Sequence, residues 1–398
     1  MKVLIITNRV PLPEDCGYNI AVNNIIKGFN EFGCNITLLS INTNKHFVNE
    51  SSISFSFKNN IEVYTVNVNT DVTITGALCN LFTNKSYNIS RFDSEELRNQ
   101  LVRLLSADNF DIVQLEGLYV SMYTDIIRKY SKAKIIMRAH NVEYKIWERL
   151  SYSTSFLPKK LYLKLLTNRL RKYENNKLKD YDSIITFSNN DKKIFSDSFA
   201  EQNYYVNPIG IEDGKIGIRS CSEVNSIYFL GSLDWLPNVE GLEWFMSEIW
   251  EKVSNKFPEL KFYIAGRSMP DSIRKINAKN VIICGEVEDA VYYSLSHNIM
   301  VVPLLSGSGI RVKILEALSW GKPVISTTIG AEGIEYENAK NIMIADNADE
   351  FIHAIDKIIN DNEFANNLNL NATELIRQKY SNKEITSQLL KYYNTLLK

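Results

Sequence analysis

The alternation of short apolar runs with amphipathic helical stretches is the feature that most constrains the fold of this chain. Residues 3–6 form an apolar run, a loop that reaches Gly17 follows, and a helical pattern then continues to Gly33. Gly33 ends that helix, and residues 36–41 form the next strand. Strands that are apolar almost throughout are typical of parallel sheets covered on both faces. The N-terminal segment therefore predicts a βαβ unit of an α/β fold.

The same alternation recurs through the rest of the chain, with one clear interruption. A turn-forming cluster at residues 207–210 (NPIG) is followed by a polar stretch at 212–225. We therefore predict two doubly wound, Rossmann-like α/β domains, at residues 1–207 and 208–382. Residues 42–100 are rich in Asn, Ser and Thr and have only weak periodicity. Further strands are expected at 111–115, 134–138, 182–187, 226–230, 260–265, 280–284, 299–304, 322–326 and 341–345.

Charge and cysteine usage argue against several classes of protein. The 398 residues include 45 basic and 46 acidic side chains, and a formal net charge of −1 does not suit a nucleic-acid-binding protein. The five cysteines form no C-x-x-C pair, which is typical of reduced thiols in a cytoplasmic protein. No apolar run approaches the roughly 20 residues of a membrane span, and the first apolar run is too short for a signal peptide. We therefore expect a cytoplasmic protein.

The segment 303–327 (PLLSGSGIRVKILEALSWGKPVIST) carries the strongest chemical signal. A predicted strand ends here, and a Gly-Ser-Gly turn leads into a helix, so that backbone N–H groups can approach a phosphate. Arg311 and Lys313 fall near the start of that helix, where the helix dipole disfavours each cation by about 0.3–1 kcal/mol. A diphosphate would reverse this sign. The candidate phosphate-binding residues are Gly307, Ser308, Gly309, Arg311 and Lys313.

Glu316 follows about one helical turn later and is a candidate for holding a ribose. A carboxylate accepts bidentate hydrogen bonds from vicinal hydroxyl groups, which is how ribose is commonly bound. The alternative is that Glu316 is an i,i+3 partner of Lys313 and that both cations are ordinary surface charges. The glycines beside two unfavourably placed cations favour phosphate binding.

The same segment resembles the retaining GT-B glycosyltransferases of family 4, or glycosyl transferases group 1. The family motif is E-x7-E followed by A-x-x-x-G-x-P-V-I, and its second half is matched by Glu316, Ala317, Gly321 and residues 323–325. The resemblance extends over nearly the whole chain. It includes the proline-rich N-terminal loop, RAHNVE (138–143), NPIGI (207–211), Gly231, AGR (265–267) and GEV (285–287).

This resemblance implies two Rossmann-like domains that face each other across a cleft. The domain at residues 1–207 would bind the acceptor, the domain at 208–382 would bind a nucleotide-diphosphate sugar, and a helix at 383–398 would cross back to the first domain. The implied reaction transfers the sugar to a hydroxyl group of a glycan, free or lipid-linked, with retention of configuration. It would use neither a metal ion nor a cofactor, since the sugar nucleotide is itself the substrate.

Two departures from the family pattern concern the donor. Ser308 stands where the first glutamate of E-x7-E is expected, and that glutamate contacts sugar hydroxyls in the family. The usual basic residues after the first strand of the second domain are also absent from residues 231–238 (GSLDWLPN). Arg311 and Lys313 are the natural replacements, and the chain resembles a subgroup with the pattern G-S-G-x-R-x-K-x-L-E. The departures bear on the identity of the donor sugar more than on the reaction.

Four further residues are candidates through the same resemblance. His140 follows a predicted strand and is similar to the family histidine near the transferred sugar, although a lone histidine there is more often structural. Gly17 would let the backbone of the first domain approach the donor or the acceptor. Gly285 would place backbone groups against the base, unless it is a plain turn glycine, and Arg267 is either a donor contact or a surface arginine.

A basic stretch at residues 157–180 raises the question of membrane contact. Its lysines and arginines lie beside leucines, a composition that suits peripheral contact with anionic lipid. Glu174 and Asp180 dilute the charge, so a solvated helix face is an equally good interpretation.

Two other functions remain open from the sequence. Non-hydrolysing sugar-nucleotide epimerases share the GT-B architecture, but they need acid–base residues around the sugar, and no convincing set is present. The replacement of a motif glutamate by Ser308 is compatible with a catalytically inactive protein that binds sugar nucleotides.

Overall fold

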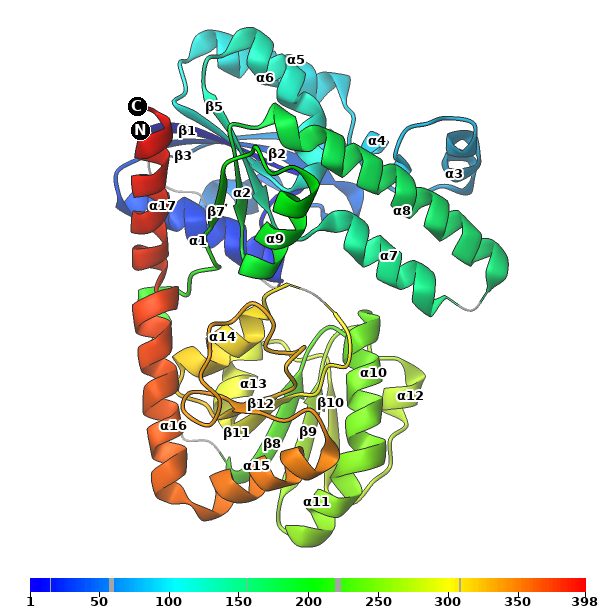
Figure 1. Ribbon diagram of the computed structural model, residues 1–398, viewed down its shortest axis with the longest axis vertical. Helices are drawn as coiled ribbons and strands as arrows, with labels where there is room; N and C mark the ends of the chain where they lie inside the picture. Colours follow the sequence, from blue (N-terminus) through cyan, green and yellow to red (C-terminus); the bar gives the residue numbers. More distant parts are fainter. Residues whose placement is uncertain (15, 57–60, 155, 219–222, 308) are drawn as a thin grey trace. The chain divides into compact units, whose positions relative to one another are not determined.

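The structure, a computed structural model, describes residues 1–398 except 15, 57–60, 155, 219–222 and 308. Internal contacts divide the chain into two units, one formed by Met1–Gly210 with Ile385–Lys398 and the other by Ile211–Glu384. The sequence placed these divisions at 207/208 and 382/383. Each unit has one parallel sheet with helices packed on it (Figure 1). The prediction of two Rossmann-like α/β domains is confirmed.

The first unit contains a seven-stranded sheet in the order β3-β2-β1-β4-β5-β6-β7. Its strands are β1 (Lys2–Thr7), β2 (Asn35–Thr43), β3 (Ile61–Val68), β4 (Ile112–Glu116), β5 (Lys134–Ala139), β6 (Ser183–Thr186) and β7 (Tyr204–Val206). Its helices are α1 (Gly17–Glu31), α2 (Glu50–Ser56), α3 (Ile74–Leu81), α4 (Tyr87–Ser90), α5 (Glu95–Ala107), α6 (Thr124–Tyr130), α7 (Glu143–Ser153), α8 (Leu157–Lys177) and α9 (Asn189–Ser198).

The second unit contains a six-stranded sheet in the order β10-β9-β8-β11-β12-β13. Its strands are β8 (Glu223–Leu230), β9 (Lys261–Ala265), β10 (Val281–Gly285), β11 (His297–Val302), β12 (Val324–Ser326) and β13 (Met343–Ile344). Its helices are α10 (Leu236–Phe245), α11 (Glu251–Lys256), α12 (Asp271–Arg274), α13 (Ala290–Ser296), α14 (Val312–Ser319), α15 (Ala348–Asn360) and α16 (Asn362–Leu375).

Both faces of each sheet are buried, which explains why the strands are apolar almost throughout. On β1, Leu4 belongs to the hydrophobic core on one face, and its neighbour Ile5 belongs to the core on the other face. On β8, Phe229 and Tyr228 divide in the same way between the two cores of the second unit. Because successive side chains of a strand point to opposite faces, a strand covered by helices on both sides is apolar at most positions on both faces.

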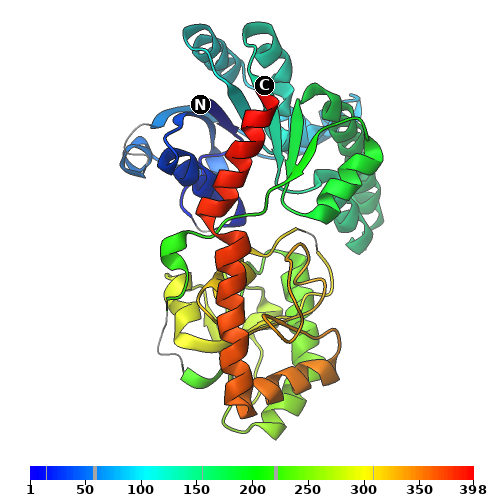
Figure 2. The same ribbon diagram turned by 60° about the vertical axis from the view of Figure 1, so that its left-hand side comes forward.

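The C-terminal helix α17 (Asn382–Leu396) packs on the first unit. Leu389 and Tyr393 join the core beneath α1, and Tyr392 stacks on Tyr205 of β7 with ring centroids 4.3 Å apart. Thr386 lies so close to Gly28 of α1 that a side chain at Gly28 would collide with it. Figure 2 shows this helix, in red, lying along the first unit.

The strand orders define where ligands are expected in each unit. In the first sheet the strand order reverses between β1 and β4, and in the second it reverses between β8 and β11, although all these strands are parallel. The loops that leave the carboxyl ends of such a strand pair diverge, and the crevice between them is the usual ligand site of open parallel sheets. The loops that follow β1, β4, β8 and β11 are therefore the segments to inspect.

Candidate functional site

The carboxyl ends of β4 and β5 bring together a buried ionic cluster in the first unit. Glu116, the last residue of β4, lies in register with Arg138 of β5. Arg138 Nη1 lies 2.9 Å from Glu116 Oε1, and His140 Nε2 lies 2.6 Å from Glu116 Oε2. Glu116 is fully buried, and the His140 side chain is 8% exposed. The predicted site residue His140 therefore has a carboxylate partner that the sequence analysis did not identify.

The electrostatics of this cluster fix the state of His140. Burial alone would raise the pKa of Glu116, but Arg138 and His140 outweigh burial and hold it at about 2. Burial lowers the pKa of His140 below its usual value, and the opposing effect of Glu116 is smaller. His140 is therefore neutral near pH 7. Because an ionised carboxylate only accepts hydrogen bonds, Nε2 carries the proton and Nδ1 is the acceptor nitrogen.

Aromatic rings enclose the histidine on two sides. The Tyr18 ring lies 4.5 Å from the His140 ring, and the Phe187 ring lies 5.0 Å from it in an edge-on arrangement. Tyr18 directly follows Gly17, the predicted glycine at the start of α1 in the loop after β1. The loop after β1 and the end of β5 thus meet at His140. This place is close to β1 and β4, between which the strand order reverses.

A hydrogen-bonded relay connects this cluster to the C-terminal helix. Tyr393 donates its hydroxyl proton to Gln114 Oε1 over 2.6 Å, and Gln114 Nε2 donates to Glu116 Oε1. Tyr393, Gln114 and Glu116 are all fully buried. The helix that returns from the end of the chain therefore supports the carboxylate that orients His140.

The second unit has its own cluster at the equivalent position, between the loops after β8 and β11. β11 ends at Val302, two residues before the predicted end, because Pro303 has no N–H to continue the ladder. Gly307 and Gly309 have φ values of +129° and +84°, in the region that favours glycine. The predicted Ser308 lies outside the described residues.

Arg311 lies closer to the loop than the sequence predicted. It is the N-cap residue, and α14 begins at Val312. Its guanidinium lies 4.7 Å from the centre of the Trp235 ring, and Nη1 donates to the Gly309 carbonyl over 2.7 Å. A side chain at Gly307 would lie 2.3 Å from Arg311 Nη2 and 3.0 Å from Trp235, so this position requires glycine. Trp235, in the loop after β8, is a residue that the sequence analysis did not single out.

Lys313 and Glu316 form a pair on the first turns of α14. Lys313 Nζ lies 3.0 Å from Glu316 Oε2, which is the i,i+3 pairing that the sequence offered as an alternative to ligand binding. Glu316 is 9% exposed. A buried carboxylate beside an ammonium can still accept a hydroxyl hydrogen bond with its second oxygen, since each oxygen has two lone pairs.

The two remaining candidates lie on neighbouring strands. Arg267, exposed after the end of β9, donates from Nε to Ser232 Oγ over 3.1 Å in the loop after β8. Gly285 ends β10 with a φ of +72°, and its carbonyl accepts from the Gly266 N–H over 2.8 Å. β10 is the edge strand, two strands away from the reversal at β8 and β11. The structure therefore brings Arg267 to the loop after β8, and places Gly285 further along the same edge.

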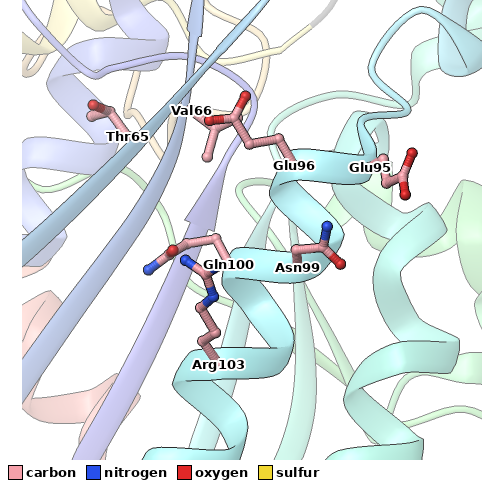
Figure 3. Close-up of a pocket in the computed structure, with 7 residues that line it drawn as sticks. All are labelled: Thr65, Val66, Glu95, Glu96, Asn99, Gln100 and Arg103. Carbon is pink, nitrogen blue, oxygen red and sulfur yellow. The ribbon is translucent and has the colours of Figure 1, made fainter.

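A separate polar depression of about 510 Å³ lies between β3 and α5 in the first unit. Thr65 and Val66 of β3 line it, together with five residues of α5 (Figure 3), which are Glu95, Glu96, Asn99, Gln100 and Arg103. It flanks the middle of an edge strand rather than a strand's carboxyl end. Within the described ranges no group of three or more His, Cys, Asp and Glu side chains is arranged to hold a metal ion. None of the described helices combines the length and apolar composition needed to cross a bilayer.

Comparisons with known proteins agree with this architecture. Residues 224–361 match the family model described as Glycosyl transferases group 1. An uncharacterized 44.6 kDa protein of the cps region of Klebsiella pneumoniae is 24% identical over 305 residues, which cover 74% of this chain and 77% of that protein.

Solved structures resemble the chain over its whole length. Sucrose-phosphate synthase of Thermosynechococcus elongatus has a TM-score of 0.70 and 13% identity, with 100% of this chain and 99% of that chain covered. Anabaena HepE in complex with UDP-glucose has a TM-score of 0.69 and 14% identity, with 99% and 100% covered. A variant of S. aureus TarM, in complex with fondaparinux, α-GlcNAc-glycerol and UDP, has a TM-score of 0.68 and 13% identity, with 99% of each chain covered. The chain has the GT-B fold, and residues 224–361 of its second unit are similar to the glycosyl transferases of group 1.

Proposed function

We propose that this protein is a cytoplasmic glycosyltransferase that takes a sugar from a nucleoside diphosphate sugar bound by the second unit. The acceptor is a hydroxyl group of a glycan, free or lipid-linked, which gives the enzyme a role in polysaccharide biosynthesis. Configuration at the transferred carbon is retained, and no metal ion takes part. The family match in residues 224–361 supports the reaction class.

The observation that carries this proposal is the glycine loop that ends in Arg311 and α14. Two glycines with positive φ, a guanidinium held over Trp235 and the start of an eight-residue helix come together after β11. Backbone N–H groups at a helix start favour an anion, and a guanidinium binds phosphate oxygens with two hydrogen bonds. Lys313 adds a second cation, which would interact with the diphosphate as well as with Glu316. Glu316 would then accept hydrogen bonds from the ribose hydroxyls.

The chemistry that this arrangement supports is charge stabilisation on the leaving diphosphate. Negative charge grows on the phosphate as the sugar bond breaks, and pre-positioned cations lower the barrier because they need no reorganisation. In retaining transfer of this kind the leaving phosphate also accepts the proton of the attacking hydroxyl, so no separate base is required. His140 would contact the transferred sugar through Nδ1, because Nε2 is held by Glu116.

Structures similar to this chain include complexes with UDP and UDP-glucose, so uridine nucleotides are the first ligands to test. Thermal unfolding should be followed with uridine, guanosine and adenosine diphosphate sugars, since a ligand of the native state raises Tm. We expect one base to raise Tm, and nucleoside diphosphate to be released when an acceptor glycan is added. Absence of a shift with every nucleotide would overturn the assignment. Epimerisation of the donor without acceptor would identify an epimerase, and binding without any turnover would identify an inactive protein.

A further inference from the structure

Helices α7 and α8 form a hairpin on the first unit. The two helices pack along each other, and Figure 1 shows them extending side by side away from the region of the sheet. α8 is anchored by buried residues on one face, including Leu163, Leu166 and Leu170. Arg169 donates to the carbonyls of Asn80 and Leu81, which fixes α8 against the end of α3. The hairpin is therefore a firmly packed element, and its other face is turned to solvent.

Large apolar side chains are exposed around the turn of the hairpin. Phe156 and Leu157, at the start of α8, are 66% and 64% exposed. The exposed apolar residues of the hairpin end are Leu150, Tyr152, Phe156, Leu157 and Leu161. Single exposed leucines are ordinary, but several large apolar residues gathered at one end of an element mark an interaction site.

The same segment is strongly basic although the whole chain is nearly neutral. Residues 149–173 contain seven lysines and arginines and not one aspartate or glutamate, whereas the formal net charge of the chain is −1. Arg171 is paired with Glu148 of α7, and Arg169 is used in contacts with α3. The other basic residues of the segment are Arg149, Lys159, Lys160, Lys164 and Lys172. This concentration of charge calls for an anionic partner.

The order of residues along the exposed face of α8 indicates which anionic partner fits. Leu157 and Leu161 occupy that face near the turn, and Lys164 and Lys172 continue it away from the turn at helical spacing. An apolar end followed by cations matches the layers of a membrane surface, where acyl chains lie beneath anionic headgroups. We propose that the end of this hairpin inserts into an anionic lipid surface, with Phe156 and Leu157 below the headgroups and the lysines among them.

Other anionic partners fit this pattern less well. A nucleic acid would neutralise the lysines but would leave the apolar end exposed to water, since phosphates and sugars offer it no apolar surface. An acidic protein would have to combine an apolar pocket with an acidic rim. A lipid surface satisfies both requirements with one partner. Membrane binding through this surface does not depend on the transferase activity, so the two proposals can fail independently.

The test is co-sedimentation of the full chain with phosphatidylcholine vesicles that contain roughly a third phosphatidylglycerol. Binding should be absent with pure phosphatidylcholine and should weaken as salt rises to about 0.15 M. Replacing Lys159, Lys160 and Lys164 with Gln should weaken partitioning about a hundredfold, since each cation near such a surface contributes roughly fivefold. Replacing Phe156 and Leu157 with Ser should weaken it about tenfold while the lysines stay in place.

Matched variants in the second unit control for charge and apolarity. Replacing the exposed Lys252, Lys275 and Lys279 with Gln removes the same number of charges, and replacing Tyr292 and Leu370 with Ser removes two exposed apolar side chains. Both controls should bind vesicles like the wild type. The proposal is wrong if wild type does not bind at low salt, or if the controls lose as much binding as the hairpin variants. If the Phe156 and Leu157 variant binds as well as wild type, insertion is excluded and the lysines serve a different anionic partner.

Discussion

Replacing Arg311 with Ala separates a role in transfer from a role in folding. The substitution removes the stacking of the guanidinium on Trp235, worth about 0.5–1 kcal/mol, and the hydrogen bond to Gly309, worth about 0.5–1.5 kcal/mol. It also removes a cation from the start of α14, which returns about 0.3–1 kcal/mol because the helix dipole repels it. These terms partly cancel, so the free energy of unfolding should fall by no more than about 2 kcal/mol.

The effect on turnover should be far larger than this. If Arg311 binds the leaving diphosphate, its contact strengthens as charge develops in the transition state. Loss of one such donor costs roughly a hundredfold or more in kcat, equivalent to about 3 kcal/mol. Arg311→Lys keeps the charge but loses the planar fork and the stacking on Trp235, so it should recover only part of the rate.

The assay is release of nucleoside diphosphate from the donor at saturating acceptor, with thermal unfolding measured in parallel. Arg377→Ala is the matched control, because Arg377 is an exposed arginine of the same unit that pairs with Glu374. Turnover of the control should match wild type. If Arg311→Ala folds and keeps nearly the kcat of the wild type, the phosphate role is refuted. If Arg377→Ala loses as much kcat as Arg311→Ala, the loss comes from removing any positive charge of the second unit and not from this site.

Four further predictions concern single substitutions in the two units. Glu316→Gln should weaken binding of the nucleoside diphosphate by about tenfold with little change in kcat, measured by calorimetry, because the ribose contact is present before reaction. Gly307→Ala should impair donor binding with fold retained, since the new side chain meets Arg311, and unchanged affinity would show that the loop adapts. Glu116→Gln should destabilise the first unit by about 3–5 kcal/mol in urea unfolding, because Arg138 would become a buried charge without its counter-ion; a change below 1 kcal/mol would contradict this. Burial raises the pKa of Glu143 to about 7. The stability that the protonated carboxyl contributes is therefore complete below about pH 4.5 and is lost as pH rises through 7, with a slope of at most about 1.4 kcal/mol per pH unit. Glu143→Gln should flatten this dependence of the free energy of unfolding on pH.

The fold could be predicted because its decisive signals are local. A strand buried on both faces is mostly apolar, and this is visible in residues 3–6 and 36–41 without knowledge of their neighbours. β3 and β7 were not predicted from the sequence, because neither is buried on both faces along its length. β3 (Ile61–Val68) is an edge strand whose residues are mostly half-buried, and β7 has three residues, so neither imposes an apolar run. Edge strands tolerate polar side chains, and a polar strand resembles a loop in sequence.

The candidate sites could be predicted only where a local pattern marks them. Gly307 and Arg311 lie in one short segment, and their unusual combination is apparent from the sequence alone. Glu116 was not identified, because its importance depends on register between β4 and β5, which places it beside Arg138 and His140. Trp235 was missed for a similar reason, since it reaches Arg311 only when the loops after β8 and β11 meet. Contacts between distant segments require the sheet order, and no spacing along the chain encodes it.

The charged groups at the two loop clusters differ in what they offer a diphosphate. In the first unit the carboxylate of Glu116 lies between Arg138 and a neutral His140, and a second cation, Arg9, lies 4.6 Å from the centre of the Tyr18 ring that packs on His140. An added diphosphate there would meet a fixed carboxylate at close range. In the second unit Glu316 pairs with Lys313, Arg311 lies over the Trp235 ring, and the start of α14 adds the positive end of a helix dipole. Asp234 and Glu240 also contact these loops, through Ser232 and Ser306, so a diphosphate would bind there through Arg311 and the N–H groups at the start of α14 rather than through an overall positive charge. The same strand-order rule marks both loop clusters, and under the proposed function the donor diphosphate binds at the second while the neutral histidine of the first contacts hydroxyl groups.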